Sequence, residues 1–361
     1  MVQPATLDDL DALVDLEHRC FDSDRLSRRS FRRMITRANA ALLIDREGDA
    51  LRGYALVLFH AGSSLARLYS VAVDPAHRGH GIARTLLAEA ERVAGERDCI
   101  DMRLELRRDN SDALKLYEAS GYRQFDVQAD YYEDHMDAVR MEKSLVPPLP
   151  SHKVRVPYYE QTLDFTCGSA AMLMAMQALD PNLVPSRKLE LRIWREATTV
   201  YMTSGHGGCG PYGLALSAHH RGFNVEVWID GGVSELFVDS VRNEEKKTVI
   251  RLVQQDFLEE LAACGIPLLK GPVTIDRVQE AFEAGGIPVV LTRDPHWVVV
   301  TGFDERFVYV HDPYVDEDEN QSRVDCVNRP ILKKEFSSMA RYGRDKQRAV
   351  IIVKERRCPN T

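Results

Sequence analysis

Hydrophobic positions in the first 145 residues follow helical and strand-like spacings in turn. Leucine and valine recur at helical intervals in 10–16, and a second helix is expected after Ser27, a suitable N-cap residue. The stretches 41–45, 51–60 and 65–74 are rich in branched and aromatic residues and predict three strands. This alternation predicts an α/β fold with a central sheet.

The pattern breaks at VPPLPSHK, residues 146–153, where three prolines prevent a helix or a central strand from continuing. A new apolar helix begins after the break, near Cys167. At 361 residues the chain is long enough for two domains. We therefore expect a first domain over 1–145, a linker over 146–153 and a second domain over 154–361.

Composition narrows the class of protein. A net charge of −8 argues against a general nucleic-acid binder. No apolar stretch approaches the ~20 residues of a membrane-spanning helix, and the acidic N-terminus does not resemble a secretory signal. The seven cysteines are scattered without a CxxC pair, which favours free thiols in a reducing cytoplasm. The sequence carries no signal for the oligomeric state.

A glycine-rich segment in the first domain is the first candidate site. In 73–95 a strand ends, Pro75 follows, and glycines precede a helix that is expected from about Ile82. Glycines at this place let the backbone approach a phosphate, and the first-turn N–H groups then face the anion. Arg78 adds positive charge. The alternative is a tight turn that needs glycine only for its dihedral angles.

Residues 100–125 form a second candidate region. Met102, Leu104 and Leu106 alternate along a predicted strand, so Glu105 faces away from the apolar side. Asn110 precedes the following helix, where helix capping is the alternative reading. Tyr117 lies on that helix. The alternatives for Glu105 and Tyr117 are a solvated carboxylate and a ring packed in the core.

Together these segments resemble the GNAT superfamily of acetyl-CoA-dependent N-acyltransferases, especially the ribosomal-protein alanine acetyltransferases. The family motif Arg/Gln-x-x-Gly-x-Gly/Ala matches 78–83, the strand LYSVAV matches 68–73, and LELRRDNSDALKLYEASGY matches 104–122. The resemblance covers 1–145 and implies a mixed central sheet and acetyl-CoA as co-substrate. The residues that it assigns to acetyl-CoA binding are Val71, Val73, Arg78, Gly79, Gly81, Ile82, Ala83, Arg84 and Asn110.

The same resemblance implies catalytic roles for two residues. Glu105 corresponds to the general base on the acceptor amine, and Tyr117 to the general acid toward the departing thiolate. The paired Tyr131 and Tyr132 near the end of the domain are retained. The Pro-Trp-Ser element that follows the first helix in the family is replaced by DSDRLSRRSF (22–31). This difference leaves the identity of the acceptor peptide open.

Cys167 is the candidate nucleophile of the second domain. It begins the predicted helix CGSAAMLMAMQAL, where free N–H groups and the helix dipole favour a thiolate. The alternative is a buried thiol, since free cysteines are among the most buried residues.

A predicted hairpin supplies a base. The strands 297–303 and 307–312 are joined near Asp304, so His296 is expected directly opposite Asp312, within hydrogen-bonding reach. A one-residue slip would place the two side chains on opposite faces. Gln161 lies just before Cys167 and offers a side-chain amide for an oxyanion, with the Cys167 N–H as second donor.

This set of residues resembles the papain-like peptidases that remove double-glycine leaders during bacteriocin export. The matching elements are Gln161, Cys167-Gly168, HWVVVTGF from His296, VYVHDP with Asp312, and the glycine-rich segment 207–228, so that the resemblance covers about 154–353. It implies a helix bearing the cysteine and an antiparallel sheet bearing histidine and aspartate. Those peptidases are fused to membrane exporters, which this chain lacks, so cleavage coupled to export is not expected. Hydrolysis and acyl transfer to an amine both remain open.

Metal sites are not expected. His206 and Cys209 have a metal-like spacing, but two ligands are too few for structural zinc. A zinc site built from Cys167 and His296 would leave Gln161 and Asp312 without a role. The acidic run 316–320 is read as a solvated loop, with a cation site as the alternative.

The sequence therefore predicts a bifunctional cytoplasmic enzyme. One domain would transfer acetyl to an amine, such as a peptide N-terminus, and the other would break or re-form an amide through Cys167. Its partners would be acetyl-CoA and a peptide or protein, with neither nucleic acid nor membrane. The alternative is that one domain is inactive and binds peptide for the other.

Overall fold

The computed structural model describes residues 2–36, 39–132, 134–147, 151–198, 207–230, 236–238, 241–293, 295–316, 318, 321–343 and 346–357. The chain divides into two units, Met1–Pro148 and Leu149–Thr361. This division falls inside the segment 146–153 that the sequence predicts as a linker. The end of that segment differs from the prediction, because His152–Lys153 form strand β8, which pairs with Gly302 and Phe303 of the second unit.

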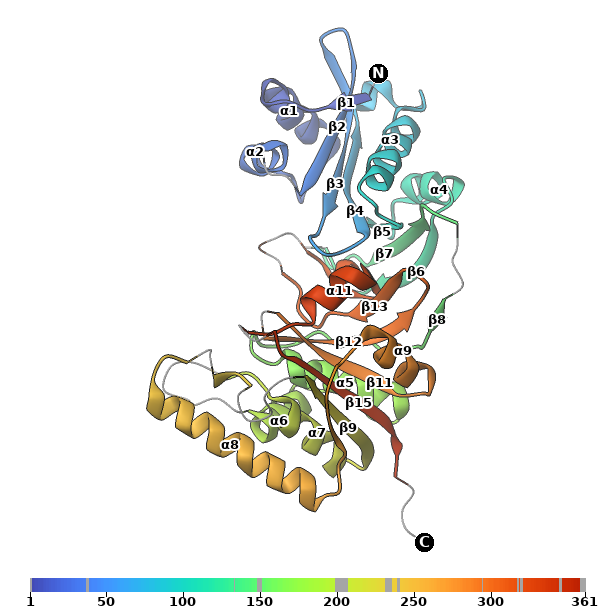
Figure 1. Cartoon of the computed structure of the whole chain (residues 1–361). Helices are drawn as coiled ribbons and strands as arrows, with labels where there is room; N and C mark the ends of the chain where they lie inside the picture. Colours follow the sequence, from blue (N-terminus) through green and yellow to red (C-terminus); the bar gives the residue numbers. More distant parts are fainter. Residues whose placement is uncertain are drawn as a thin grey trace. The chain divides into compact units, whose positions relative to one another are not determined.

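The first unit is built on one mixed sheet in the order β1-β2-β3-β4-β5-β7-β6 (Figure 1). Its strands are β1 (Val2–Pro4), β2 (Ala40–Glu47), β3 (Ala50–Phe59), β4 (Leu65–Val73), β5 (Asp101–Arg107), β6 (Arg123–Gln128) and β7 (Ala138–Ser144). Its helices are α1 (Leu10–Cys20), α2 (Arg28–Thr36), α3 (Ile82–Glu96) and α4 (Ser111–Ala119), with short 3-10 turns at Leu7–Asp9 and Pro75–His77.

Alternation along the strands divides this unit into two cores. In β2, Leu42 and Ile44 pack with the apolar residues of α1 and α2, whereas Leu43 packs with those of α3. Helices α1 and α2 therefore cover one face of the sheet, and α3 and α4 cover the other.

Two neighbouring parallel strands of this sheet, β4 and β5, separate part-way along their length. Strand β4 pairs with β3 as far as Val73, with a bulge at Tyr69. Its parallel pairing with β5 joins only 65–68 to 101–104, although β5 continues beside β7 to Arg107. Beyond Leu68 and Leu104 the strands separate, so the end of β4 has a strand on one side only.

The second unit contains a larger sheet in the order β10-β9-β15-β11-β12-β13-β14, with β8 added beside β12 (Figure 1). Its other strands are β9 (Phe223–Asp230), β10 (Leu268–Lys270), β11 (Ile287–Thr292), β12 (His296–Phe303), β13 (Phe307–His311), β14 (Arg329–Leu332) and β15 (Arg348–Arg356). Its helices are α5 (Cys167–Leu179), α6 (Arg187–Ala197), α7 (Pro211–His220), α8 (Glu244–Ala263), α9 (Ile275–Glu283), α10 (Arg323–Cys326) and α11 (Lys333–Met339).

Helix α5 is buried against this sheet. Each residue from Cys167 to Met176 is buried, and α5 contacts β11, β12 and β15. A methyl group added at Gly168 would lie 3.0 Å from the Trp297 ring, so Trp297 faces α5. Its neighbour Val298 then faces away from α5 by strand alternation. Among the described residues, no helix is long and apolar enough to cross a membrane.

The β12–β13 hairpin corrects the predicted register. Val299 pairs with His311 and Val300 with Val310, and a bulge follows before Gly302 pairs with Tyr309. The predicted alignment, centred on Asp304, is wrong by two positions. The cause is the turn, in which the Asp304 carboxylate accepts the N–H groups of Arg306 and Phe307 and so moves the centre past Asp304. Asp312 therefore lies after β13, diagonal to His296 rather than opposite it.

The crossing of α6 and α7 provides a test of the packing. An added methyl at Gly213 would lie 2.5 Å from the Ala197 Cα and 3.0 Å from its carbonyl oxygen, which are backbone atoms that cannot rotate away. We expect Gly213→Ala to lower the free energy of unfolding by about 1–3 kcal/mol. Gly95→Ala is the control, because nothing lies within 4 Å of that added methyl in α3. Urea unfolding of both variants measures the difference, and an unaltered Gly213→Ala protein would contradict this packing.

Candidate active sites

Cys167 is the first residue of α5 and is 7% exposed. The first helical hydrogen bond runs from the Ala170 N–H to the Thr166 carbonyl, so the N–H groups of 167–169 have no acceptor within the helix. The thiol lies 4.0 Å from the Pro295 carbonyl oxygen. The backbone N–H groups of Gly168, at the start of the helix, and of Trp297, on β12, both act to lower the pKa of the thiol and so favour a thiolate.

His296 begins β12 and is hydrogen-bonded to Asp312, with 2.6 Å between Nε2 and Oδ1. The Asp312 carboxylate also accepts the Tyr314 N–H at 3.0 Å, and the Arg329 guanidinium lies 3.7 Å from its other oxygen. The predicted contact between His296 and Asp312 is thus present despite the shifted register. Since Nε2 faces the carboxylate, Nδ1 is the ring nitrogen left to interact with the Cys167 thiol, which acts on the pKa of His296.

The electrostatics of these three groups favour an ion pair. Burial alone would raise the pKa of the Cys167 thiol, but the hydrogen bond and charge of His296 bring it below its ordinary value. Burial alone would lower the pKa of His296, but the Asp312 carboxylate and the Cys167 sulfur raise it well above its ordinary value. Burial opposes ionisation of Asp312 as well, and His296 nevertheless lowers its pKa. Thiolate, imidazolium and carboxylate therefore form one charged row.

Gln161 makes hydrogen bonds next to both ends of this row, beside Asp312 and in the loop before Cys167. Its backbone N–H donates to the Pro313 carbonyl at 2.9 Å, directly after Asp312. Its side-chain Nε2 donates to the Leu163 carbonyl at 2.9 Å, while Oε1 is buried without a hydrogen-bond partner among the described residues. The amide carries a second N–H, which is the donor that an oxyanion role requires.

Glu190 was missed by the sequence reasoning. This residue of α6 is 0% exposed, and its carboxylate accepts hydrogen bonds from the loop that precedes Cys167. A signal did exist, because Glu190 shares a helical stripe with the buried Ile193 and Ala197. A carboxylate in an apolar stripe indicates a specific buried partner.

In the first unit, the predicted anion site lies at the start of α3. Gly79 and Gly81 have φ angles of +82° and +77°, which only glycine adopts without strain, and nothing lies within 4 Å of a methyl added at either. The first helical hydrogen bond joins the Thr85 N–H to the Gly81 carbonyl. The backbone N–H groups of Ile82, Ala83 and Arg84 therefore have no acceptor within the helix. The space and the free donors fit a phosphate group.

The remaining predicted acetyl-CoA residues lie along the same side of the unit. Val71 and Val73 belong to the end of β4, beyond its pairing with β5. The Val73 carbonyl accepts hydrogen bonds from Arg78 Nε at 3.3 Å and from the Cys20 thiol at 3.4 Å. The Asn110 side chain caps α4 by accepting the Ala113 N–H at 3.1 Å, which is the alternative that the sequence offered. The separated end of β4 leaves room for an extended co-substrate to pair with its backbone.

Glu105 lies within a cluster of charged and polar groups. Its carboxylate contacts Arg67 Nη2 at 2.5 Å, Arg140 Nε at 3.1 Å and the Tyr131 hydroxyl at 3.0 Å, and its side chain is 4% exposed. The sequence predicted the face of Glu105 correctly but not these arginines. The carboxylate therefore lies between two guanidinium groups and a phenol.

Tyr117 lies on the other face of the sheet. It packs in the core of α3 and α4 together with Leu104 and Leu106, the neighbours of Glu105 that point the opposite way. Burial raises the pKa of Tyr117 to about 12, so the phenol keeps its proton at neutral pH. The two predicted catalytic groups therefore lie on opposite faces of the sheet, and the gap between β4 and β5 lies between them.

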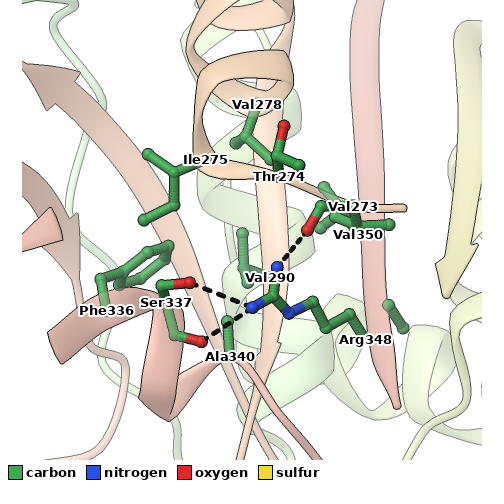
Figure 2. A pocket seen from close by; sticks show the side chains of 11 residues that line it. Val273, Thr274, Ile275, Val278, Val290, Phe336, Ser337, Ala340, Arg348 and Val350 are labelled. Carbon is green, nitrogen blue, oxygen red and sulfur yellow. Dashed lines mark hydrogen bonds between the residues drawn. The ribbon is translucent and has the colours of Figure 1, made fainter. Parts of the chain in front are cut away.

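A small pocket on the second unit is separate from the Cys167 site. Figure 2 shows Arg348 reaching across it, with its guanidinium hydrogen-bonded to the carbonyl of Val273 and to Ser337. Val290 lines this pocket and pairs with Val298, which faces away from α5. The pocket thus opens on the face of the sheet opposite Cys167.

The other predicted candidates add no further site. His206 lies outside the described residues, as do 317, 319 and 320 of the acidic run. Within the described ranges, no group of three or more histidine, cysteine, aspartate or glutamate side chains is arranged to hold a metal ion. The six described cysteines are free thiols.

Comparison with known families agrees with this geometry. Residues 156–354, more than half of the chain, match the Peptidase_C39 like family. The chain belongs to the Peptidase_C39 like family. Residues 10–122 match the Acetyltransferase (GNAT) family, so this family member also carries an N-terminal GNAT acetyltransferase domain. Both resemblances predicted from the motifs are confirmed, and GNAT acetyltransferases use acetyl-CoA as co-substrate.

Individual relatives are similar to part of the chain. An uncharacterized Mycobacterium leprae protein is 33% identical over 34% of this chain and 34% of its own length. A Salmonella typhimurium ribosomal protein bS18-alanine N-acetyltransferase is 33% identical over 21% of this chain and 53% of its own. The Escherichia coli ribosomal-protein-S18-alanine N-acetyltransferase structure is 22% identical, covering 41% of this chain and 95% of its own, with a TM-score of 0.38. The alignments thus span about a third and about half of the first two relatives' own lengths.

The charged row predicts how the reactivity of Cys167 depends on pH. Because the pKa of Cys167 is lowered, iodoacetamide should alkylate it below the ~8.5 of an ordinary thiol. Asp312→Asn removes the charge that raises the pKa of His296, so the imidazolium is lost at lower pH and the thiolate loses its partner. The midpoint of alkylation should then move up by about one unit. Mass spectrometry of each cysteine across pH measures this midpoint.

Two controls accompany this measurement. Cys209 should resist alkylation, because burial raises the pKa of its thiol to about 12. Asp276→Asn, an exposed carboxylate on α9, should leave the Cys167 midpoint unchanged. If Cys167 follows the same pH profile in the folded and the urea-unfolded chain, the thiolate is not activated.

Proposed function

We propose that this Peptidase_C39 like family member is a bifunctional enzyme of the cytoplasm. Its first unit would acetylate an amine such as a peptide N-terminus, and its second would cleave or re-form an amide through a Cys167 thioester. The observation that carries the second activity is the hydrogen-bonded pair of His296 and Asp312 beside a cysteine at a helix N-terminus. A reducing compartment would keep that cysteine a thiol.

For acetyl transfer, we assign the start of α3 to the phosphates of acetyl-CoA and the end of β4 to its pantetheine arm. Glu105 would take the proton from the attacking amine. The nitrogen becomes strongly acidic once its bond to carbon forms, so a carboxylate suffices as the base. Tyr117 would give its proton to the departing sulfur. The names of the relatives favour a peptide beginning with alanine as the acceptor.

For the second unit, we propose a papain-like arrangement and reaction. The Cys167 thiolate attacks the carbonyl carbon, and the oxygen that becomes negative is bound by the Cys167 N–H and the Gln161 side chain. The His296 imidazolium gives its Nδ1 proton to the leaving amine, which leaves a thioester on Cys167. His296 then takes a proton from water or from a second amine, which attacks the thioester and frees the thiol.

The acetyltransferase proposal is tested at Glu105. Glu105→Gln should lower kcat for acetylation of an alanine peptide by about 100-fold or more, because proton transfer by a positioned base contributes about 10²–10⁴. Glu142→Gln is the matched control, since Glu142 is also paired with an arginine, Arg103 of β5, at 2.5 Å. Acetyl-CoA binding measured by calorimetry should persist in both variants. Equal loss of kcat in both would show that ion pairing, rather than base catalysis, is what matters.

The bifunctional proposal is tested with p-nitrophenyl acetate, a small acyl donor for Cys167. Wild-type protein should release p-nitrophenolate and carry an acetyl adduct on Cys167, and Cys167→Ala should abolish both while leaving peptide acetylation by acetyl-CoA unchanged. Glu105→Gln should show the reverse pattern. An adduct that forms as readily in His296→Ala would argue against a papain-like site, because the thiolate would not depend on its imidazolium.

A further inference from the structure

Glu190 is a buried carboxylate whose described hydrogen-bond donors are all neutral. Its Oε1 accepts the Thr162 N–H at 2.9 Å and the Thr166 hydroxyl at 2.5 Å. Its Oε2 accepts the Thr162 hydroxyl at 2.7 Å and the Tyr159 hydroxyl at 3.0 Å. A carboxylate is costly to bury and is retained where its hydrogen bonds hold a required geometry.

These donors bracket the segment from Gln161 to Cys167. Thr162 directly follows Gln161, and Thr166 directly precedes Cys167, so one carboxylate oxygen joins the two ends of the segment. The Leu163 carbonyl completes the loop, because it accepts hydrogen bonds from the Gln161 side chain at 2.9 Å and from the Thr166 N–H at 3.1 Å. The carboxylate therefore sets the distance across a short loop whose two ends carry the proposed oxyanion donors.

We propose that Glu190 is a positioning residue that fixes the Gln161 side chain and the Cys167 N–H as a pair of oxyanion donors. The inference rests on the proposed chemistry of Cys167. Donor pairs of this kind act only when they are held in place before the reaction. Glu190 would act through the loop, without touching the substrate.

The four contacts need hydrogen-bonding atoms at both oxygens of the side chain. The Thr162 N–H can only donate, whereas the three hydroxyl groups can donate or accept. Glutamine could keep these contacts, with its oxygen at the Thr162 N–H and its NH2 facing the Thr162 and Tyr159 hydroxyls. Leucine has no polar side-chain atom, so Glu190→Leu releases the loop.

The test separates two reactions of the same thiol. Acylation of Cys167 by p-nitrophenyl acetate develops negative charge on a carbonyl oxygen, whereas alkylation by iodoacetamide does not. Glu190→Leu should lower acylation by about 10- to 100-fold, and Glu190→Gln should lower it much less. The rate and pH midpoint of alkylation should be unchanged, because His296 and the N–H groups of Gly168 and Trp297 lie outside this loop.

Glu196→Leu is the matched control. Glu196 lies on the same helix, and its carboxylate accepts hydrogen bonds from Arg221 and Ser217 of the following segment, at 2.7 Å and 2.8 Å. This variant should leave both reactions unchanged. If Glu190→Leu does not fold, Thr162→Val removes one donor from an exposed position and should lower acylation alone, by a smaller factor.

A double-mutant cycle identifies the route of the effect. In a Gln161→Ala background, Glu190→Leu should lower the rate of acylation much less than in wild type, because part of its effect passes through Gln161. Equal losses of acylation and alkylation, or unchanged acylation, would overturn the inference. A wild-type Cys167 that neither alkylates at low pH nor acylates would instead reject the proposed function itself.

Discussion

A thiolate in a buried position is stable only beside a positive charge, and this requirement organises the second unit. Desolvation opposes every charged group in the row of Cys167, His296 and Asp312. Each charge is nevertheless favoured, because its neighbour carries the opposite sign at hydrogen-bonding distance. The sulfur is placed by the first turn of α5, the imidazole by the start of β12 and the carboxylate by the segment after β13. Removing any one partner would leave the others buried and uncompensated.

The two buried glutamates illustrate different solutions to the same physical problem. Glu105 is paired with the guanidinium groups of Arg67 and Arg140. Glu190 is compensated by neutral hydroxyl and amide donors, so its charge is stabilised by hydrogen bonds from its own neighbourhood. The first arrangement balances the carboxylate with cations from the two neighbouring strands, β4 and β7. The second suits a carboxylate that shapes a loop without placing a cation next to a thiolate–imidazolium pair.

Local sequence patterns were sufficient to predict the faces of strands and the ends of helices, but not the partners across the fold. The alternation of Met102, Leu104 and Leu106 placed Glu105 on the correct face, and the small residues after Cys167 marked the start of α5. Arg67 and Arg140 are 38 and 35 residues away from Glu105, and no local pattern joins them to it. The contact between His296 and Asp312 was predicted, although its register was wrong by two positions. Such a shift preserves the face, and the imidazole and the carboxylate meet along the diagonal.

Both units use the start of a helix as a source of N–H donors, but for different anions. At α3, glycines with positive φ leave open space above the donors, which suits an anion that arrives with a substrate. At α5, the donors surround a sulfur that belongs to the chain and is 7% exposed. The protonation states that the two proposed reactions need are compatible. The lowered pKa of Cys167 and the raised pKa of His296 both favour their ion pair, and Tyr117, with a pKa of about 12, keeps its proton at neutral pH. The two proposed reactions therefore do not require opposite pH conditions, which a single chain carrying both could not meet.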